Sequence, residues 1–242
     1  MRDIGGGWIL GSPNTHRRLV LDLVAETNAA VFFVNYTLAP DAQFPIPNQQ
    51  AHAAVTWLHA SDNAKRLGLD HKLTAFAGDS AGGTMAAAVN LMSLQKGLKH
   101  LLPKCNVLFY PVTDVSKESC SYQTFVNGPG LAAQTLRWMV GAFIPRKEDR
   151  RSILASPLLA GENILSGFPE TLVVVAEVDP LRDEGEAFAR HLSASGVRTT
   201  AMRVLGTVHD FVMLNALADT PATRLAIETA ARGIKKAFAA KE

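Results

Sequence analysis

Ser80, with one glycine two positions before it and another two positions after it, is the residue of this chain best suited to act as a nucleophile. Ser80 lies within Gly78-Asp79-Ser80-Ala81-Gly82, between the apolar run from Leu73 to Ala77 and an alanine-rich helical pattern. A serine at such a strand–turn–helix junction has a strained backbone, and only small residues two positions before and after it avoid a clash. Gly78 and Gly82 hold those positions. The turn predicts a nucleophilic serine at the carboxyl edge of a sheet, facing the positive end of a helix dipole.

A general base for this serine is expected among the seven histidines of the chain. His209 follows the strand pattern from Thr199 to Val204 through the turn-forming Leu-Gly-Thr-Val, so it is expected at a carboxyl strand edge. The other six lie in or beside helical or polar segments, where a surface or helix-flanking role is the ordinary one: His16, His52, His59, His71, His100 and His191.

The acid that orients a catalytic histidine is expected after the preceding strand. The apolar run from Thr171 to Ala176 ends in Glu-Val-Asp-Pro-Leu-Arg-Asp-Glu. Asp183 and Glu184 fit the first turn of a helix, where carboxylates commonly serve the cap and the dipole. Asp179 lies in the loop and precedes a proline, which disfavours helical geometry. We therefore choose Asp179 as the acid, with Glu177 as the second candidate.

Donors for a negatively charged oxygen are expected from two places. Ala81 follows the nucleophile and offers its backbone N–H at the helix start. The other source is Gly5-Gly6-Gly7, because glycines allow backbone amides to approach a substrate carbonyl closely. A triple glycine near a terminus is often a flexible tail, but the Trp8-Ile-Leu that follows indicates a packed segment.

Strand and helix patterns alternate along the chain, which predicts a parallel sheet covered by helices on both faces. The expected strands are 30–36, 73–77, 106–110, 171–176 and 199–204. The expected helices are 15–28, 48–67, 81–97, 184–195 and 221–238. The stretch from Val115 to Gly167 has weaker periodicity and several prolines, and it is interpreted as an insertion packed over the edge of the sheet. Residues 1–242 are expected to form one domain.

Composition excludes several classes of protein. The net charge is +2 and the basic residues are spread along the chain, so no nucleic-acid partner is expected. No uninterrupted apolar stretch reaches the length of a membrane span, and no apolar signal region follows the first charges, which predicts a cytoplasmic protein. Cys105 and Cys120 give no disulfide framework and are expected as free thiols.

These motifs together resemble the hormone-sensitive-lipase-like family of α/β-hydrolase esterases. Gly5-Gly6-Gly7-Trp8 is similar to the end of the family's HGGGW block, Asn35 to Pro40 to its D-Y-R-L-A-P segment, and Gly78 to Gly83 to its G-D-S-A-G-G elbow. The match continues in order with Tyr110-Pro-Val, Ser156-Pro-Leu, Asp179-Pro-Leu-Arg-Asp and His209-Asp-Phe. The order serine, acid, histidine is also that of the α/β hydrolases.

The resemblance implies an α/β-hydrolase fold and hydrolysis of small carboxylic esters with short to medium acyl chains, without a metal or organic cofactor. Carried over onto the matching positions, Ser80, Asp179 and His209 form the catalytic triad. The backbone amides of Gly6, Gly7 and Ala81 form the oxyanion hole. Trp8 and Phe211, beside two of these motifs, are expected to contact the substrate.

Three features depart from the family pattern. Ile4 stands where the family has a histidine that supports the glycine loop. Asp210 replaces the usual glycine after the catalytic histidine and adds a charge beside the base. The glycine block lies only four residues into this chain, so the first strands and the N-terminal lid are expected to be missing. That would leave residues 30–36 without a neighbouring strand and would favour association, with a homo-oligomer as one outcome.

Two classes of function follow. The first is a serine carboxylesterase that works through an acyl-enzyme. The second is an inactive or ligand-binding α/β-hydrolase remnant without turnover. Retention of all three triad residues favours the enzyme, whereas the shortened N-terminal part favours the remnant.

Overall fold

The segments that are expected to contain the catalytic residues belong to one parallel sheet or follow its strands. The computed structural model describes residues 2–3 and 6–240. Within this part, six parallel strands are ordered β2-β1-β3-β4-β5-β6. The strands are β1 (Arg2–Asp3), β2 (Phe33–Val34), β3 (Ala75–Asp79), β4 (Cys105–Phe109), β5 (Glu170–Val178) and β6 (Thr199–Val208).

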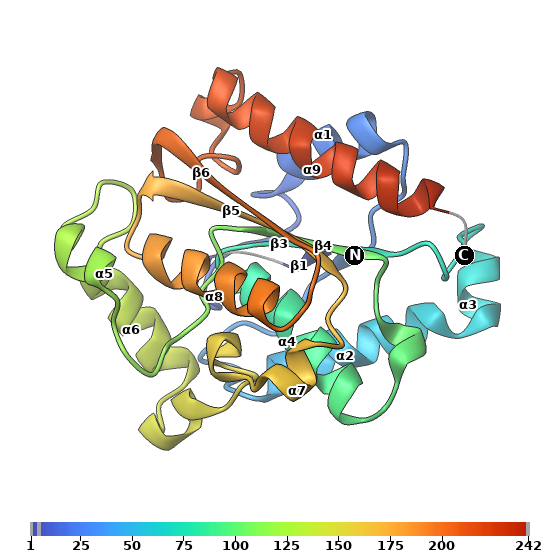
Figure 1. The fold of residues 1–242 in the computed structure, drawn as a ribbon, viewed down its shortest axis with the longest axis horizontal. Coiled ribbons are helices and arrows are strands. Elements are labelled where there is room, and N and C mark those ends of the chain that lie inside the picture. Colours follow the sequence, from blue (N-terminus) through green and yellow to red (C-terminus); the bar gives the residue numbers. More distant parts are fainter. Residues whose placement is uncertain (1, 4–5, 241–242) are drawn as a thin grey trace.

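Helices cover both faces of the sheet (Figure 1). Helices α1 and α9 pack on one face, with α2, α4, α7 and α8 on the other. The helices are α1 (Arg17–Thr27), α2 (Ile46–His59), α3 (Ser61–Arg66), α4 (Ala81–Gln95), α5 (Cys120–Thr124), α6 (Ala133–Phe143), α7 (Glu162–Leu165), α8 (Arg182–Ala194) and α9 (Pro221–Ala239). Short 3-10 turns are η1 (Lys99–Leu101), η2 (Lys147–Arg151), η3 (Pro157–Leu159) and η4 (Asn215–Leu217).

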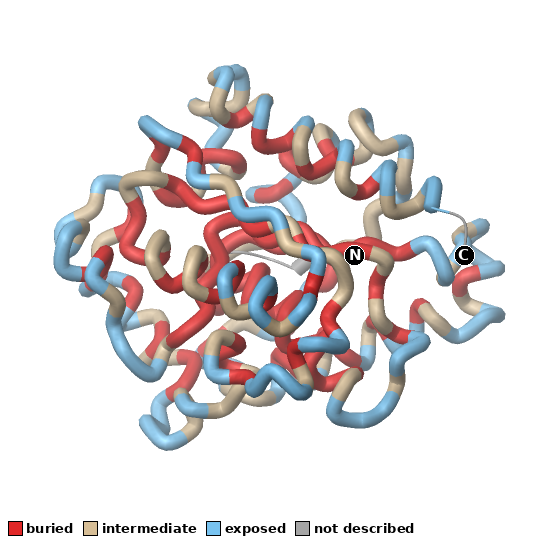
Figure 2. The backbone as a smooth tube through the Cα atoms, viewed as in Figure 1, coloured by how far each residue is buried: buried red, intermediate tan, exposed pale blue. Residues whose placement is uncertain are grey.

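The central strands consist mostly of apolar residues because both of their faces are buried. Every residue of β3 and β4 is buried, and the buried backbone passes through the middle of the molecule (Figure 2). Helix α4 behind them is also buried along nearly its whole length, which explains its alanine-rich sequence with little polar face. This covered parallel sheet confirms the α/β-hydrolase architecture expected from the sequence.

The elements differ from the expectation in a few places. The helix expected over 48–67 is two helices, because the backbone of Ala60 is extended and separates α2 from α3. The 115–167 segment contains α5, α6, η2, η3 and α7. Cys105 and Cys120 are both free thiols, as expected.

The strand beside β2, expected to be missing, is present over two residues. Strand β1 lies between β2 and β3, pairing Arg2 with both Phe33 and Ala77. The expectation of an entirely open gap beside residues 30–36 is therefore wrong. A two-residue strand carries too little sequence pattern to be recognised from alternation or apolar runs.

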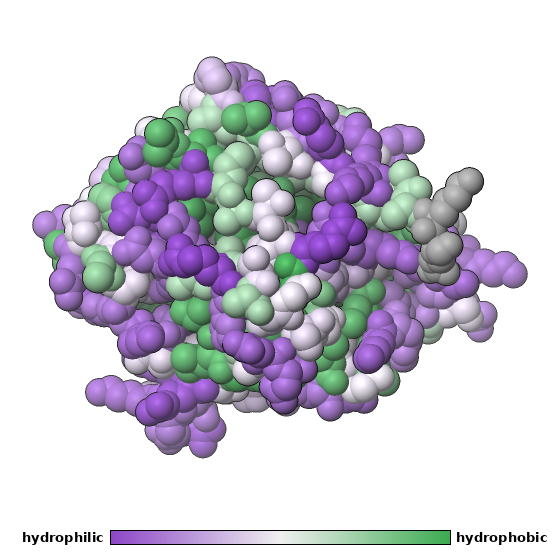
Figure 3. Space-filling view, in the orientation of Figure 1, coloured by the Kyte–Doolittle hydropathy of each residue, from purple (hydrophilic) through white to green (hydrophobic). Residues whose placement is uncertain are grey.

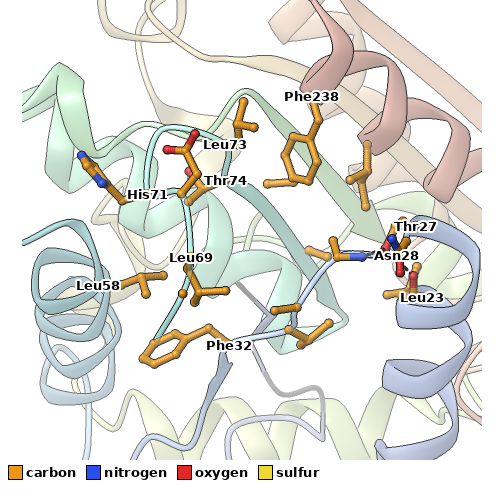
Figure 4. A pocket seen from close by; sticks show the side chains of 18 residues that line it. Leu23, Thr27, Asn28, Phe32, Leu58, Leu69, His71, Leu73, Thr74 and Phe238 are labelled. Atoms are coloured by element: carbon orange, nitrogen blue, oxygen red, sulfur yellow. Dashed lines mark hydrogen bonds between the residues drawn. The ribbon is translucent and has the colours of Figure 1, made fainter. Parts of the chain in front are cut away.

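A cavity of about 460 Å³ nevertheless lies at the amino-terminal edge of these strands. Its walls come from the segments that lead into β2 and β3 and from α1, α2 and α9 (Figure 4). Among the labelled side chains, Leu23, Phe32, Leu58, Leu69 and Phe238 border this space. Because the strands are parallel, the cavity is at the opposite edge of the sheet from Ser80.

A buried chain of polar side chains ties α4 to the two strands beside it. Asn90 Nδ2 donates to Asn106 Oδ1 at 2.9 Å, and Asn106 Nδ2 donates to Thr171 Oγ1 at 3.1 Å. All three residues are at most 1% exposed. A buried amide must have its partners, so this chain fixes the position of β4 relative to α4 and β5.

Replacing the middle residue of this chain should destabilise the fold. Asn106→Ala removes two buried hydrogen bonds and leaves a cavity, which should lower the free energy of unfolding by about 2–4 kcal/mol. Urea denaturation would measure the loss. The exposed Asn215→Ala is the control and should change stability by less than about 0.5 kcal/mol. Equal effects of the two variants would contradict a structural role for the buried chain.

Candidate active site

Ser80 lies in a sharp turn between β3 and α4. Its backbone has φ 53° and ψ −121°, a conformation that non-glycine residues rarely adopt. Hydrogen bonds hold the turn from both sides. Ser80 N donates to Phe109 O at 2.9 Å, while Ser80 O accepts from Gly83 N at 3.0 Å and from Val112 N at 3.3 Å. The serine is thus fixed by the neighbouring strand and by the first turn of its own helix.

The glycines around Ser80 are required by close approach of the backbone. A Cβ on Gly78 would collide with the carbonyl oxygen of Gly82. A Cβ on Gly83 would lie 2.7 Å from Pro111 Cβ, closer than real side chains approach. Strand β3 and helix α4 can therefore meet at this angle only with glycine at position 78, as the sequence motif predicts. Glycine at position 83 lets α4 approach the segment that follows β4.

His209 and Asp179 meet Ser80 at the carboxyl edge of the sheet. The Ser80 hydroxyl is 3.0 Å from His209 Nε2, and His209 Nδ1 is 2.7 Å from Asp179 Oδ2. The three residues come from the ends of β3, β5 and β6 and are at most 4% exposed. The arrangement places a hydroxyl, an imidazole and a carboxylate in one hydrogen-bonded line.

The two candidate acids have different partners. The second oxygen of Asp179, Oδ1, accepts from Leu181 N at 2.9 Å, so its carboxylate is held on both sides. Glu177 Oε2 instead accepts from Gly206 N at 2.7 Å and ties β5 to β6. The geometry supports Asp179 over Glu177 as the partner of His209.

The charges around His209 favour its protonated form. Burial lowers the pKa of His209, but the negative charges of Asp179 and Asp210 and the hydrogen bond to Asp179 outweigh burial. Together they raise the pKa of His209 to about 9. The surroundings of His209 therefore favour the imidazolium form over the neutral imidazole.

The glycine segment expected to donate to an oxyanion is only partly described. Ile4 and Gly5 lie outside the described residues. Gly6 and Gly7 have φ values of 107° and 58°, which glycine adopts without strain. A Cβ on Gly7 would overlap the sulfur of Met139 on α6, so this segment packs directly against that helix. Ala81, the third expected donor, is the first residue of α4.

The two residues expected to contact substrate are placed in the core. Trp8 is fully buried and stacks on Phe143 of α6 with 4.7 Å between ring centroids. Phe211 is 1% exposed and packs 5.8 Å from the ring of Tyr110. Both side chains are large and mainly apolar, so their removal from water is more favourable in the core than in an open site. In this structure the two rings pack in the core next to the Gly6-Gly7 segment and the His209 segment.

The sequence interpretation missed one polar residue near Ser80. His16, expected as a surface or helix-flanking histidine, precedes α1 but is only 1% exposed. Its Nε2 lies 3.2 Å from Oδ2 of Asp79, the residue before Ser80. A histidine far away in sequence from Asp79 gives no local signal of this contact. It supplies a buried partner to a carboxylate that would otherwise be costly to bury.

The carboxylates expected to cap a helix form contacts with the 115–167 segment and the β4 loop. Asp183 Oδ2 accepts from Ser121 N at 2.8 Å. Glu184 Oε1 accepts from Thr113 N at 2.7 Å and from Asp114 N at 3.2 Å. Burial raises the pKa of Glu184 to about 8 against these hydrogen bonds. Both side chains hold loops at the same edge of the sheet as Ser80.

Two features are absent from the described residues, a metal-binding cluster and a membrane-spanning helix. Across 2–3 and 6–240, no three or more His, Cys, Asp or Glu side chains are grouped so that they could hold a metal ion. In the same part of the chain, no helix has both the length and the apolar character needed to cross a membrane. On the face drawn in Figure 3, hydrophilic residues occupy most of the outline, with apolar ones between them.

Known proteins resemble this chain in sequence and in fold. A family model described as the α/β-hydrolase fold matches residues 5–213. An esterase of Gibberella moniliformis is 42% identical over 235 residues, covering 97% of this chain and 73% of that protein. Ethyl acetate hydrolase of Pseudomonas putida is 36% identical over 214 residues, covering 88% of this chain and 65% of that protein.

A solved structure agrees with these relatives. Carboxyl esterase 2 of the mycorrhizal fungus Tuber melanosporum superimposes with a TM-score of 0.95 at 43% identity, covering 98% of this chain and 77% of that one. The chain thus spans about two thirds to three quarters of the length of the proteins it matches. From the family match and these identities, the chain belongs to the α/β-hydrolase family, within its hormone-sensitive-lipase-like branch.

Proposed function

We propose that this chain hydrolyses carboxylic esters through an acyl-enzyme on Ser80, with His209 as general base and Asp179 as the acid that orients it. The observation that carries the proposal is the buried hydrogen-bonded line from Asp179 through His209 to Ser80, with contacts of 2.7 and 3.0 Å. The relatives support the ester-hydrolase class, because those described above are an esterase, an ethyl acetate hydrolase and a carboxyl esterase.

Each group has a defined task in this reaction. His209 Nε2 takes the proton of the Ser80 hydroxyl as its oxygen attacks the ester carbonyl, and then gives that proton to the departing alcohol. A water activated by the same nitrogen releases the acid. Asp179 accepts from Nδ1–H, which leaves Nε2 free to act as the base. The backbone N–H groups of Gly6, Gly7 and Ala81 are proposed to stabilise the oxygen that becomes negative.

The 115–167 segment is proposed to be a lid-like cover within a single domain formed by residues 1–242. Helix α6 supports this role because Met139 packs on Gly7 and Phe143 stacks on Trp8. Helix α5 approaches from the other side, where the Ser121 hydroxyl donates to Pro180 O at 2.5 Å beside Asp179. The segment therefore contacts both the proposed oxyanion loop and the acid loop.

Small esters with short to medium acyl chains are the proposed substrates. We expect the purified chain to hydrolyse p-nitrophenyl acetate and butyrate faster than the octanoate. Measured initial rates would establish this order. A chain that turns over none of the three esters would favour the alternative of a ligand-binding remnant. Self-association and a cytoplasmic location stay predictions, and light scattering would test the first.

Removal of the Ser80 hydroxyl should abolish turnover. Ser80→Ala keeps the backbone and removes one small atom, so the fold should be retained while ester hydrolysis falls by more than about a hundredfold. Initial rates together with a thermal melt would show both effects. Ser166→Ala, at an exposed serine, is the matched control and should keep full activity. A Ser80→Ala variant with more than about a hundredth of the activity would refute Ser80 as the nucleophile.

The two acids should respond differently to neutralisation. Asp179→Asn removes the acceptor that fixes the tautomer of His209 and should lower kcat by a factor on the order of 10⁴. Glu177→Gln keeps an acceptor oxygen near Gly206 N and should change kcat only a few-fold. Steady-state kinetics of both variants would compare them. The reverse ranking would assign the orienting role to Glu177.

A further inference from the structure

A second carboxylate lies beside the nitrogen of His209 that faces the nucleophile. Asp210 Oδ1 is 3.6 Å from His209 Nε2, while Ser80 Oγ is 3.0 Å from the same atom. Nε2 therefore faces two oxygens, a hydroxyl that must give up a proton and a carboxylate that attracts one. Asp179, by contrast, contacts the opposite nitrogen, Nδ1.

The position of Asp210 is set by its backbone. Its φ is 64°, in the left-handed region that glycine prefers and that aspartate tolerates better than most residues. The side chain is 27% exposed, but Oδ1 is buried and has no hydrogen-bond donor among the residues that the structure describes. A buried carboxylate oxygen without a donor interacts strongly with a neighbouring cation, because little solvent screens it. The nearest such group is the imidazole of His209.

Other groups around His209 come from every neighbouring element. Asp179 follows β5, and the ring of Tyr110, after β4, lies 4.8 Å from the His209 ring. Asp79 at the end of β3 also favours the protonated imidazole and is hydrogen-bonded to His16. From α1, the Arg18 guanidinium donates to Val212 O and pairs with Asp22.

Asp210 differs from these groups in position. Among the carboxylates that act on His209, Asp210 is the one paired with Nε2. Burial raises the pKa of Asp210, and the attraction of His209 opposes this rise. The charge of Asp210 in turn contributes to the raised pKa of His209.

We propose that Asp210 is a positioning residue whose charge beside Nε2 stabilises the imidazolium form of His209 and so confines activation of Ser80 to alkaline pH. The proposal rests on the proposed function, because it assigns His209 as the base. While Nε2 carries a proton beside the Asp210 carboxylate, it has no lone pair to accept the proton of Ser80. As the pH rises, His209 loses that proton and Ser80 becomes reactive.

The proposal predicts that loss of the Asp210 charge moves the pH profile of activity to lower pH. A base is active in its deprotonated form, so kcat/KM should rise with pH through the pKa of His209 in the free enzyme. An opposite charge within a few ångströms shifts a pKa by about 1 unit or more. Loss of the Asp210 charge should therefore move the acid limb of the profile downward by about 1 pH unit. At pH values well below this limb, kcat/KM of the variant, expressed as a fraction of its value on the alkaline plateau, should be about tenfold higher than the same fraction for the wild type.

The test compares two Asp210 variants with a control variant that loses the same negative charge at another, exposed position. Asp210→Asn keeps the size and the tolerance for positive φ, and Asp210→Gly restores the residue of the family pattern. Asp219→Asn removes an exposed carboxylate nine positions later and should leave the profile unchanged. The profile of kcat/KM for p-nitrophenyl butyrate is recorded from pH 6 to 10 at constant ionic strength, with a thermal melt for each protein.

A second readout separates this proposal from the proposed function. The imidazole resonances of His209, assigned by comparison with a His209→Gln variant, are titrated by NMR in the wild-type chain and in both Asp210 variants. A downward shift in both Asp210 variants, absent in Asp219→Asn, supports the proposal even if ester turnover proves to depend on another serine. An unchanged titration in Asp210→Asn and Asp210→Gly, or the same shift in the control, overturns it.

Discussion

The site depends on the narrow gap between the end of β3 and the start of α4. That gap holds Ser80 at φ 53° and leaves no room for a side chain on Gly78, which faces the carbonyl oxygen of Gly82. The strained backbone conformation of Ser80 is held by hydrogen bonds from Gly83 N and Val112 N to the serine carbonyl, and by the hydrogen bond from Ser80 N to Phe109 O. Because β3, β5 and β6 are parallel, their carboxyl ends bring Asp179 and His209 to the hydroxyl that the turn presents.

Buried charge is the second constraint on this edge of the sheet. Carboxylates at Asp79, Asp179 and Asp210 act on one imidazole, and each lies largely out of solvent. Buried carboxylates need partners, which explains why His16 packs against Asp79 and why Leu181 N donates to Asp179. The same negative charges raise the pKa of His209 and would stabilise the imidazolium that the proposed reaction forms. The proposed chemistry and its proposed pH range therefore share one electrostatic origin.

Residue patterns predicted the features that depend on neighbours in sequence. The glycine spacing around Ser80, the apolar runs of β3 to β6 and the proline after Asp179 each carry a local signal. The features that escaped prediction depend on contacts between distant segments. Strand β1 has only two residues and is defined by pairing with β2 and β3. His16 meets Asp79 only in the folded chain. The sequence indicated that the Trp8 segment is packed, but it gave no sign that the ring stacks on Phe143 of α6.

The central claim is that Ser80 attacks the ester while the amides of Gly6, Gly7 and Ala81 receive the negative oxygen. A crystal structure of the chain after reaction with a small fluorophosphonate tests this claim most directly, because the tetrahedral phosphorus imitates the intermediate of acyl transfer. The account predicts phosphorus bonded to Ser80 Oγ, with its oxygen about 2.7–3.1 Å from these amide nitrogens. Phosphorus on another residue, or an oxygen turned away from all three amides, would contradict it.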